Sequence, residues 1–280
     1  GQAHPAYYEP QGLGWLRTFP GGLLATCGLA YMGAPCVDEG EELGLHGRVG
    51  TLPAEELGCW TAWEGDDLWM RIQGTVTEGV IFGNPLRLTR AISAKLGGNS
   101  ILFEDTVENL GGMPTPHMML YHFNLGFPVL GPAARLVSHS LDVKPRDAEG
   151  AKGLEMYAEF QQPTPGYAEQ VFYHDLATDN EGDARVALVN PELDGGLGVF
   201  LRYHKKTLPR FIQWKMMGYG SYVLGLEPGN AYVGGRDKER AAGTLPVLQP
   251  GESRSYTVEI GVLDGLAEIE EFERQVRQGA

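Results

Sequence analysis

Residues 118–128, MMLYHFNLGFP, are almost wholly apolar, yet they carry a histidine and an asparagine two positions apart. Successive side chains of a β-strand point to opposite faces, so His122 and Asn124 share one face with Leu120. Burying two such polar groups without partners costs roughly 1–3 kcal/mol each. The stretch therefore predicts a strand whose polar pair meets protein atoms, water or a ligand.

Glycine and proline divide the rest of the chain into short pieces, because 40 glycines and 18 prolines are spread over 280 residues. Many pieces have β-type patterns, and strands are expected at 100–109, 185–190, 198–204, 210–217, 221–227 and 256–263. Only 265–279 is typical of a helix, with an apolar stripe from Leu266 to Val276. We expect an all-β protein of large, mostly antiparallel sheets with a short C-terminal helix. No repeat or linker interrupts residues 1–280, so a single domain is expected.

Charge and composition limit the partners. A formal net charge of −14 argues against nucleic acid or an anionic membrane surface, since both favour a basic face. No apolar run is long enough for a transmembrane helix, and the first residues lack the pattern of a signal peptide, so a cytoplasmic protein is expected. The odd number of cysteines, Cys27, Cys36 and Cys59, favours reduced thiols over a disulfide framework or a zinc site.

Three further segments hold polar groups in unusual settings. His46 lies between Gly44 and Gly47, where bare backbone permits tight turning and close approach of a ligand. Glu227 ends a predicted strand directly before a proline, which holds it stiffly. Arg17 sits among Trp15, Leu16 and Phe19. Each also has a plain structural explanation, as a loop histidine, a carboxylate that caps a turn or pairs with an arginine, and a surface arginine.

Taken together, these segments resemble the aldose 1-epimerase (galactose mutarotase) superfamily, and most closely its poorly characterised bacterial branch. GLHGR (44–48) resembles the family's Leu-His-Gly-Gly element, whose histidine binds the sugar. YHFNLGFP (121–128) resembles its His-x-Tyr-Phe-Asn-Leu element, whose histidine is the general acid. GLEPGNA (225–231), followed by LQPGES (248–253), resembles its Glu-Pro segment, whose glutamate is the base. The resemblance implies a galactose-mutarotase-like β-supersandwich with an open sugar cleft.

The resemblance assigns roles but also shows departures. It implies Glu227 as base, His122 as acid and His46 as a sugar ligand, with Asn124 beside them. When Phe123-Asn124-Leu125 is laid on the family's Phe-Asn-Leu, the family's histidine falls on Leu120, two residues before His122. His117 is therefore a rival for the acid.

The expected substrate is a small carbohydrate whose charge is open. Arg48 replaces the second glycine of the family's element, and HKKTLPRFIQWK (204–215) is rich in basic residues. If the sugar is phosphorylated, sulfonated or a uronic acid, we expect it to be held by basic or polar side chains. The candidates are Arg17, Arg48, Lys205, Lys206, Gln213 and Lys215.

Anomer interconversion needs only acid and base groups. A base takes the proton of the anomeric hydroxyl and an acid protonates the ring oxygen, after which the ring opens, rotates and closes. A Glu–His pair suits these roles, and no metal or organic cofactor is expected. A non-catalytic sugar-binding or regulatory protein on the same scaffold is the alternative, since a fold does not fix a function. A monomer or homodimer is expected.

Overall fold

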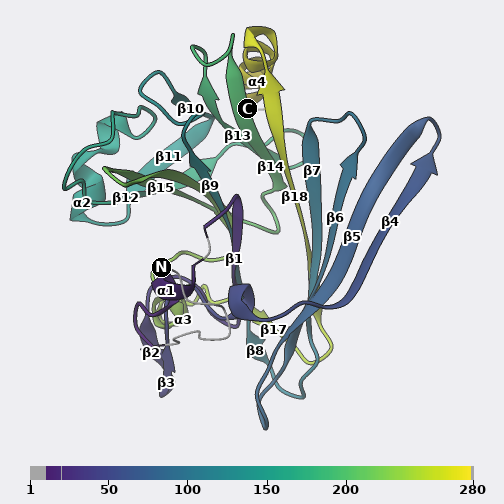
Figure 1. Ribbon diagram of the computed structural model, residues 1–280. Helices are drawn as coiled ribbons and strands as arrows, with labels where there is room; N and C mark the ends of the chain where they lie inside the picture. Colours follow the sequence, from purple (N-terminus) through teal and green to yellow (C-terminus); the bar gives the residue numbers. More distant parts are fainter. Residues whose placement is uncertain (1–10, 20, 279–280) are drawn as a thin grey trace. The chain divides into compact units, whose positions relative to one another are not determined.

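The computed structural model describes residues 11–19 and 21–278, and strands dominate this part of the chain (Figure 1). The strands are β1 (Leu24–Leu29), β2 (Cys36–Asp38), β3 (Glu41–Leu43), β4 (Glu55–Glu64), β5 (Asp67–Glu78), β6 (Leu86–Lys95), β7 (Ser100–Asn109), β8 (Thr115–Pro116), β9 (Met118–Gly126), β10 (Arg135–Ser138), β11 (Ser140–Pro145), β12 (Gln170–Leu176), β13 (Asp183–Asn190), β14 (Leu197–His204), β15 (Arg210–Gly218), β16 (Ser221–Gly229), β17 (Val247–Leu248) and β18 (Ser253–Asp264). The helices are α1 (Trp15–Thr18), α2 (Ala148–Lys152), α3 (Arg236–Ala241) and α4 (Leu266–Gln278), with 3-10 turns η2 (Val49–Thr51) and η3 (Leu154–Met156).

Two large sheets hold most of the strands. One has the order β10-β13-β14-β18-β7-β6-β5-β4 and the other β1-β9-β16-β15-β12-β11, and two small ladders join β17 to β8 and β2 to β3. The ladders with a defined register are antiparallel, as in β12 with β15 and β13 with β14. Every strand expected from the sequence is present, and β9 covers residues 118–126 of the opening stretch 118–128. The all-β expectation is confirmed.

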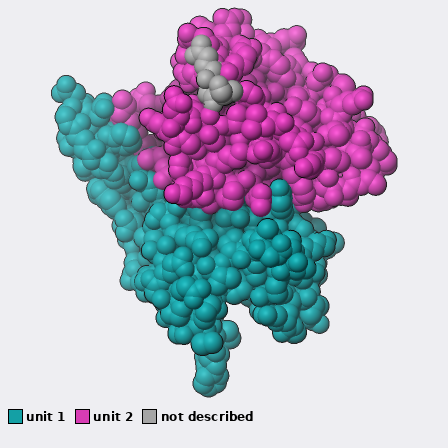
Figure 2. Space-filling model, turned by 180° about the vertical axis from the view of Figure 1, so that it is seen from behind, with its two compact units in different colours: residues 1–93, 103–122, 229–256 teal, residues 94–102, 123–228, 257–280 magenta. Residues whose placement is uncertain are grey.

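The chain forms two compact units, each built from three separate segments of the sequence (Figure 2). Unit 1 comprises residues 1–93, 103–122 and 229–256, and unit 2 comprises 94–102, 123–228 and 257–280. Neither unit is one continuous stretch of sequence. The expectation of a single domain over 1–280 stays a prediction.

The C-terminal helix of unit 2 forms as its apolar stripe predicts. Ile269, Phe272 and Val276 of α4 are buried against Ala187 and Val189 of β13. Three apolar side chains at a spacing of three and four residues lie on one helix face, so the helix covers the sheet with that face. Full burial of each such side chain stabilises the fold by roughly 1.5–3 kcal/mol.

A buried ion pair lies inside unit 1. Arg90 of β6 donates from Nε and Nη2 to the two carboxylate oxygens of Asp105 on β7, at 2.8 and 2.6 Å. The hydroxyl of Tyr121 donates to the same carboxylate at 2.6 Å, and Nη1 of Arg90 donates to Thr26 at 2.7 Å. Because Asp105 is fully buried, these bonds supply the partners that its charge needs.

Two expectations from composition meet the structure here. None of the three cysteines forms a disulfide; Cys27 is buried, Cys36 is half-buried and Cys59 is exposed. Among the helices of residues 11–19 and 21–278, none combines the length and apolarity needed to cross a membrane.

Candidate functional site

In unit 1, the loop between β3 and η2 places His46 by means of an unusual backbone. His46 has φ 59° and Gly47 has φ 81°, both in the left-handed region. A Cβ on Gly47 would lie 2.3 Å from the carbonyl oxygen of Gly28 and 2.4 Å from that of Tyr31. Only glycine fits there, so the predicted close approach at Gly47 exists and is made by the protein's own backbone.

Four rings gather around this histidine within unit 1. The Trp15 ring lies 4.9 Å from that of His46 at 62°, and Phe19 stacks on Trp15 at 4.7 Å. His122 of β9 meets His46 edge to face, with ring centroids 5.7 Å apart, and lies 6.4 Å from Phe19. The structure thus brings together two of the predicted site histidines. We call Trp15, Phe19, His46 and His122 the aromatic cluster.

Burial sets the protonation state of His46. The residue is only half-buried as a whole, but its Nδ1 is enclosed, and within residues 11–19 and 21–278 no group hydrogen-bonds to this atom. Desolvation lowers the pKa of His46 to about 4. The ring is therefore neutral at physiological pH, and one of its nitrogens offers a hydrogen bond that the described protein does not use.

His117, the predicted rival for the acid, is built into the core of unit 1. It is fully buried, its Nδ1 lies 3.1 Å from the carbonyl oxygen of Leu29, and its Nε2 lies 2.7 Å from the hydroxyl of Tyr256. Burial lowers its pKa to about 4. Because both ring nitrogens are hydrogen-bonded within the protein, we assign His117 a structural role.

The two arginines predicted in this region differ in their settings. Arg48 lies over the Tyr31 ring at 4.8 Å and pairs with Glu78 at 3.4 Å and Glu41 at 3.5 Å. Its charge is thus balanced by two carboxylates. Arg17 of α1 is exposed.

In unit 2, Glu227 lies near the end of β16 and is almost fully buried, 2% exposed. The neighbouring Gly225 makes room for it, because a Cβ there would lie 2.3 Å from Oε1 of Glu227 and 3.0 Å from Cβ of Trp214. The carboxyl of Glu227 and the side chain of Trp214 on β15 therefore occupy the same face of the sheet.

Burial and a second carboxylate both raise the pKa of Glu227. Glu169, directly before β12, accepts from Nε1 of Trp214 at 2.8 Å and from Nη2 of Arg146 at 3.0 Å. The pKa of Glu227 stands well above its usual value, first because burial disfavours the charged form and next because Glu169 repels it, whereas Arg146 acts in the opposite direction. Sequence reasoning missed Glu169 and Arg146, since neither belongs to a motif.

Gln213 and Lys215 lie on the other face of β15. They alternate with Trp214, and both side chains are buried. Gln213 donates to the carbonyl oxygen of Tyr157 at 2.7 Å, and Lys215 donates to those of Met156 and Glu159 at 2.7 and 2.6 Å. Both therefore anchor the segment around η3. The sequence predicts that both bind the substrate, but the register of β15 places them on the face of the sheet opposite Glu227.

The remaining predicted site residues of unit 2 are Lys205, Lys206 and Asn124. Lys205 pairs with Asp175 at 2.6 Å, and Lys206 is exposed. Asn124 lies on β9, partly buried and on the same strand face as His122. The basic residues that suggested an anionic sugar are thus paired with acids, exposed or tied to carbonyls. The cation beside Glu227 is Arg146 instead.

One group of acidic side chains has a spacing that a metal ion could use. Ligand atoms of Asp179, Glu181 and Asp183 lie within 4.8 Å of one another, in the turn before β13 and at its first residue. Asp179 already pairs with Arg185 at 2.7 Å and accepts from the backbone N–H groups of Glu181 and Asp183. These contacts explain the cluster as a turn, and it is unrelated to the residues above.

Comparisons with known proteins agree with this fold. The family model described as Domain of unknown function (DUF4432) matches residues 1–262. A crystal structure named "putative aldose 1-epimerase" from Klebsiella pneumoniae subsp. pneumoniae is 27% identical, with a TM-score of 0.93 over 98% of this chain and 72% of that one. No curated protein matches.

More distant structures share the fold alone. A galactose mutarotase-like protein from Clostridium acetobutylicum is 12% identical, with a TM-score of 0.56 over 78% of this chain and 68% of that one. Galactose 1-epimerase from Lactobacillus acidophilus is also 12% identical, with a TM-score of 0.53 over 89% and 81%. The resemblance to the aldose 1-epimerase superfamily is confirmed.

Proposed function

Because the chain belongs to the family described as Domain of unknown function (DUF4432) and has the fold of aldose 1-epimerases, we propose that it interconverts the anomers of an aldose. The observation that carries the proposal is the setting of Glu227. A buried carboxyl with a raised pKa, next to a carboxylate anchored by Arg146 and Trp214, is the arrangement expected of a general base.

In this proposal Glu227 takes the proton from the anomeric hydroxyl and His122 protonates the ring oxygen. The ring opens, the C1–C2 bond rotates, and closure reverses both transfers. A raised pKa makes the carboxylate of Glu227 a stronger base, and the same carboxyl can return the proton when the ring closes. Such acid–base groups contribute about 10²–10⁴-fold each, which is ample for a reaction that also proceeds in water.

His46 is proposed as a sugar ligand rather than a proton carrier. Its pKa of about 4 keeps it neutral, and its buried Nδ1, to which no described residue hydrogen-bonds, would find a partner in a sugar hydroxyl that acts as donor or acceptor. Trp15 and Phe19 give the cluster apolar ring faces, which suit the C–H face of a pyranose.

The basic residues lend little support to an anionic substrate. Arg48 and Lys205 are balanced by carboxylates, and Lys215 is held by backbone carbonyls. A neutral aldose is therefore the first substrate to test, with phosphorylated and acidic sugars beside it.

A non-catalytic sugar-binding protein is the second candidate. The observation that favours it is the position of the histidine on β9, two residues from the place that the family's acid occupies. Two residues along a strand move a side chain by about 6.5–7 Å on the same face. A binding protein would keep the sugar contacts without proton transfer.

The test is anomer exchange followed by saturation-transfer NMR for each sugar that raises the protein's melting temperature. A ligand at 100 times its dissociation constant stabilises by about 2.7 kcal/mol, so binding is detectable without turnover. We expect wild-type protein to accelerate exchange and Glu227→Gln to lose about 10²–10⁴-fold while sugar binding persists. The matched control is Glu192→Gln, an exposed glutamate of the same unit, which should leave exchange unchanged. Binding without any exchange by the wild type contradicts the isomerase proposal and supports the second candidate.

A further inference from the structure

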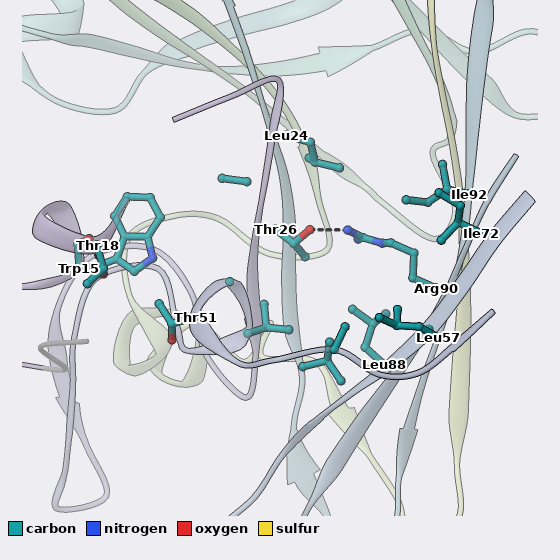
Figure 3. A pocket seen from close by; sticks show the side chains of 16 residues that line it. Trp15, Thr18, Leu24, Thr26, Thr51, Leu57, Ile72, Leu88, Arg90 and Ile92 are labelled. Carbon is teal, nitrogen blue, oxygen red and sulfur yellow. Dashed lines mark hydrogen bonds between the residues drawn. The ribbon is translucent and has the colours of Figure 1, made fainter. Parts of the chain in front are cut away.

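A cavity of roughly 320 Å³ opens inside unit 1 beside the aromatic cluster (Figure 3). Its walls come from α1, β1, η2, β4, β5 and β6, and most are aliphatic. The apolar lining includes Leu24, Val49, Leu57, Ile72, Leu88 and Ile92. This volume and this lining are typical of a pocket for a small organic group. The volume is too small for a folded protein partner.

Two of the apolar wall residues are also exposed to solvent. Leu57 of β4 is 70% exposed and Ile72 of β5 is 49% exposed, although both line the cavity. Aliphatic surface in water carries a hydrophobic cost, which an apolar occupant would remove.

The polar end of the pocket selects against a charged occupant. Arg90 reaches toward Thr26, and the dashed line in Figure 3 marks their hydrogen bond of 2.7 Å. The charge of Arg90 is balanced by Asp105 through two further bonds. Thr26 accepts from Arg90, so its own hydroxyl proton can still be donated to a ligand. The pocket thus offers an apolar body with the hydroxyl of Thr26 as a hydrogen-bond donor at its end.

Trp15 joins this pocket to the aromatic cluster. Its ring contacts His46 at 4.9 Å, and the same residue lines the cavity on the side opposite Arg90 in Figure 3. Trp15 thus belongs both to the aromatic cluster and to the wall of the cavity, which sets the pocket next to the proposed sugar ligand His46.

We propose that this pocket holds an aryl or short acyl substituent, carrying one hydrogen-bond acceptor, on the sugar that the protein binds. The inference rests on the sugar site proposed above and names the class of substrate, a reducing sugar that bears an apolar group away from its anomeric carbon. No bond is made or broken in the pocket, whose role is recognition.

Pocket occupancy is tested with acetophenone and ethylbenzene, which are nearly the same size and differ in one acceptor oxygen. We expect saturable binding of both in ligand-observed NMR titrations, tighter for acetophenone by about 2- to 10-fold because of one hydrogen bond. Thr26→Val keeps the shape and should abolish that preference. Ile72→Asp should weaken both probes more than tenfold. The matched control is Ile81→Asp, an isoleucine 83% exposed and outside the pocket, which should bind like the wild type.

The link to the sugar is tested with the mono-O-benzoyl isomers of glucose and galactose. At least one isomer should bind wild-type protein more than tenfold more tightly than its parent sugar. Ile72→Asp should lose this gain, and so should Ala54→Trp, which fills the pocket without adding charge. If no isomer gains affinity, or the gain survives both substitutions, the inference is wrong. Since these are binding measurements, a gain in a protein that exchanges no anomers leaves the inference standing and removes the proposed function. Anomer exchange without any gain in affinity for the benzoylated sugars leaves the proposed function standing and removes the inference.

Discussion

The imidazole of His46 stands nearly perpendicular to that of His122, at 87° with the ring centroids 5.7 Å apart. One histidine comes from a loop held in a left-handed conformation and the other from a strand. The loop histidine is neutral because burial lowers its pKa to about 4, so the two rings can lie together without repulsion from a charge on His46.

This arrangement predicts a binding role for His46. Replacing it with alanine should raise the KM of the sugar about 5- to 150-fold, which corresponds to a lost hydrogen bond of about 1–3 kcal/mol, with a smaller change in kcat. His204→Ala on β14, a histidine paired with Asp183 in unit 2, serves as control and should change neither constant. A fall in kcat with KM unchanged would assign proton transfer to His46 instead.

The pair Glu169 and Glu227 predicts the pH dependence of exchange. A base works when deprotonated, so the rate should rise with pH through the raised pKa of Glu227. Glu169→Gln removes one cause of the raised pKa and leaves Arg146, which lowers it, so the acidic limb of the profile should move to lower pH. The measurement is kcat/KM against pH, with Glu192→Gln as the unchanged reference. A limb that stays in place or moves upward contradicts this assignment.

Buried neutral histidines predict a loss of stability in acid. The pKa values of His117 and His174 are lowered to about 4 by burial, against about 6.5 in the unfolded chain. Between these values the unfolded state binds more protons, so their contribution is complete above pH 6.5 and is lost as the pH falls toward 4. The loss should reach about 3 kcal/mol for each group. Urea unfolding from pH 7 to pH 4 measures it, and stability that is flat over this range would contradict the predicted burial.

The ion pair of Arg90 and Asp105 predicts a large effect of a small substitution. Asp105→Asn leaves a buried guanidinium without its carboxylate and should cost about 3–5 kcal/mol of unfolding free energy. The comparison is Glu64→Gln, which breaks the pair of Glu64 with Arg71 on the exposed hairpin of β4 and β5. Since exposed pairs contribute little, that variant should unfold almost as the wild type does in urea. Equal losses in both variants would contradict the difference in burial.

The strands of the core could be predicted because their patterns are local. In β7 apolar and polar residues alternate, and β9 is an almost wholly apolar run between turn residues. In α4 four apolar residues form the stripe on one helix face. The long strands β4 and β5 were not singled out from the sequence. Their exposed side chains include Leu57, Trp63 and Ile72. Because apolar residues also lie on the exposed face, the alternation of apolar and polar residues that marks a strand is weak there.

The candidate site could be predicted only where a residue belongs to a motif. His46, His122 and Glu227 were found in this way. Trp214 lies on the same face of the sheet as Glu227, whereas its neighbours Gln213 and Lys215 lie on the other face. Which of the two faces carries Glu227 depends on the register of strands that are far apart in the sequence. Glu169 lies directly before β12 and Arg146 directly after β11, and only the folded sheet lets their charges act on Glu227, which lies far from both in the sequence.

The division of each unit into three segments has a consequence for biosynthesis. Unit 1 needs residues 229–256 as well as the first 93 residues, so a ribosome must release most of the chain before this unit can be completed. Long-range strand pairing is slow, and unfinished sheets expose strand edges. Neighbouring strands of the first half, such as β4 and β5, can pair early, but β7 lacks its partner β18 and β9 lacks its partner β16 until the last part of the chain is made. We therefore expect fragments that end before residue 229 to depend on chaperones or to aggregate.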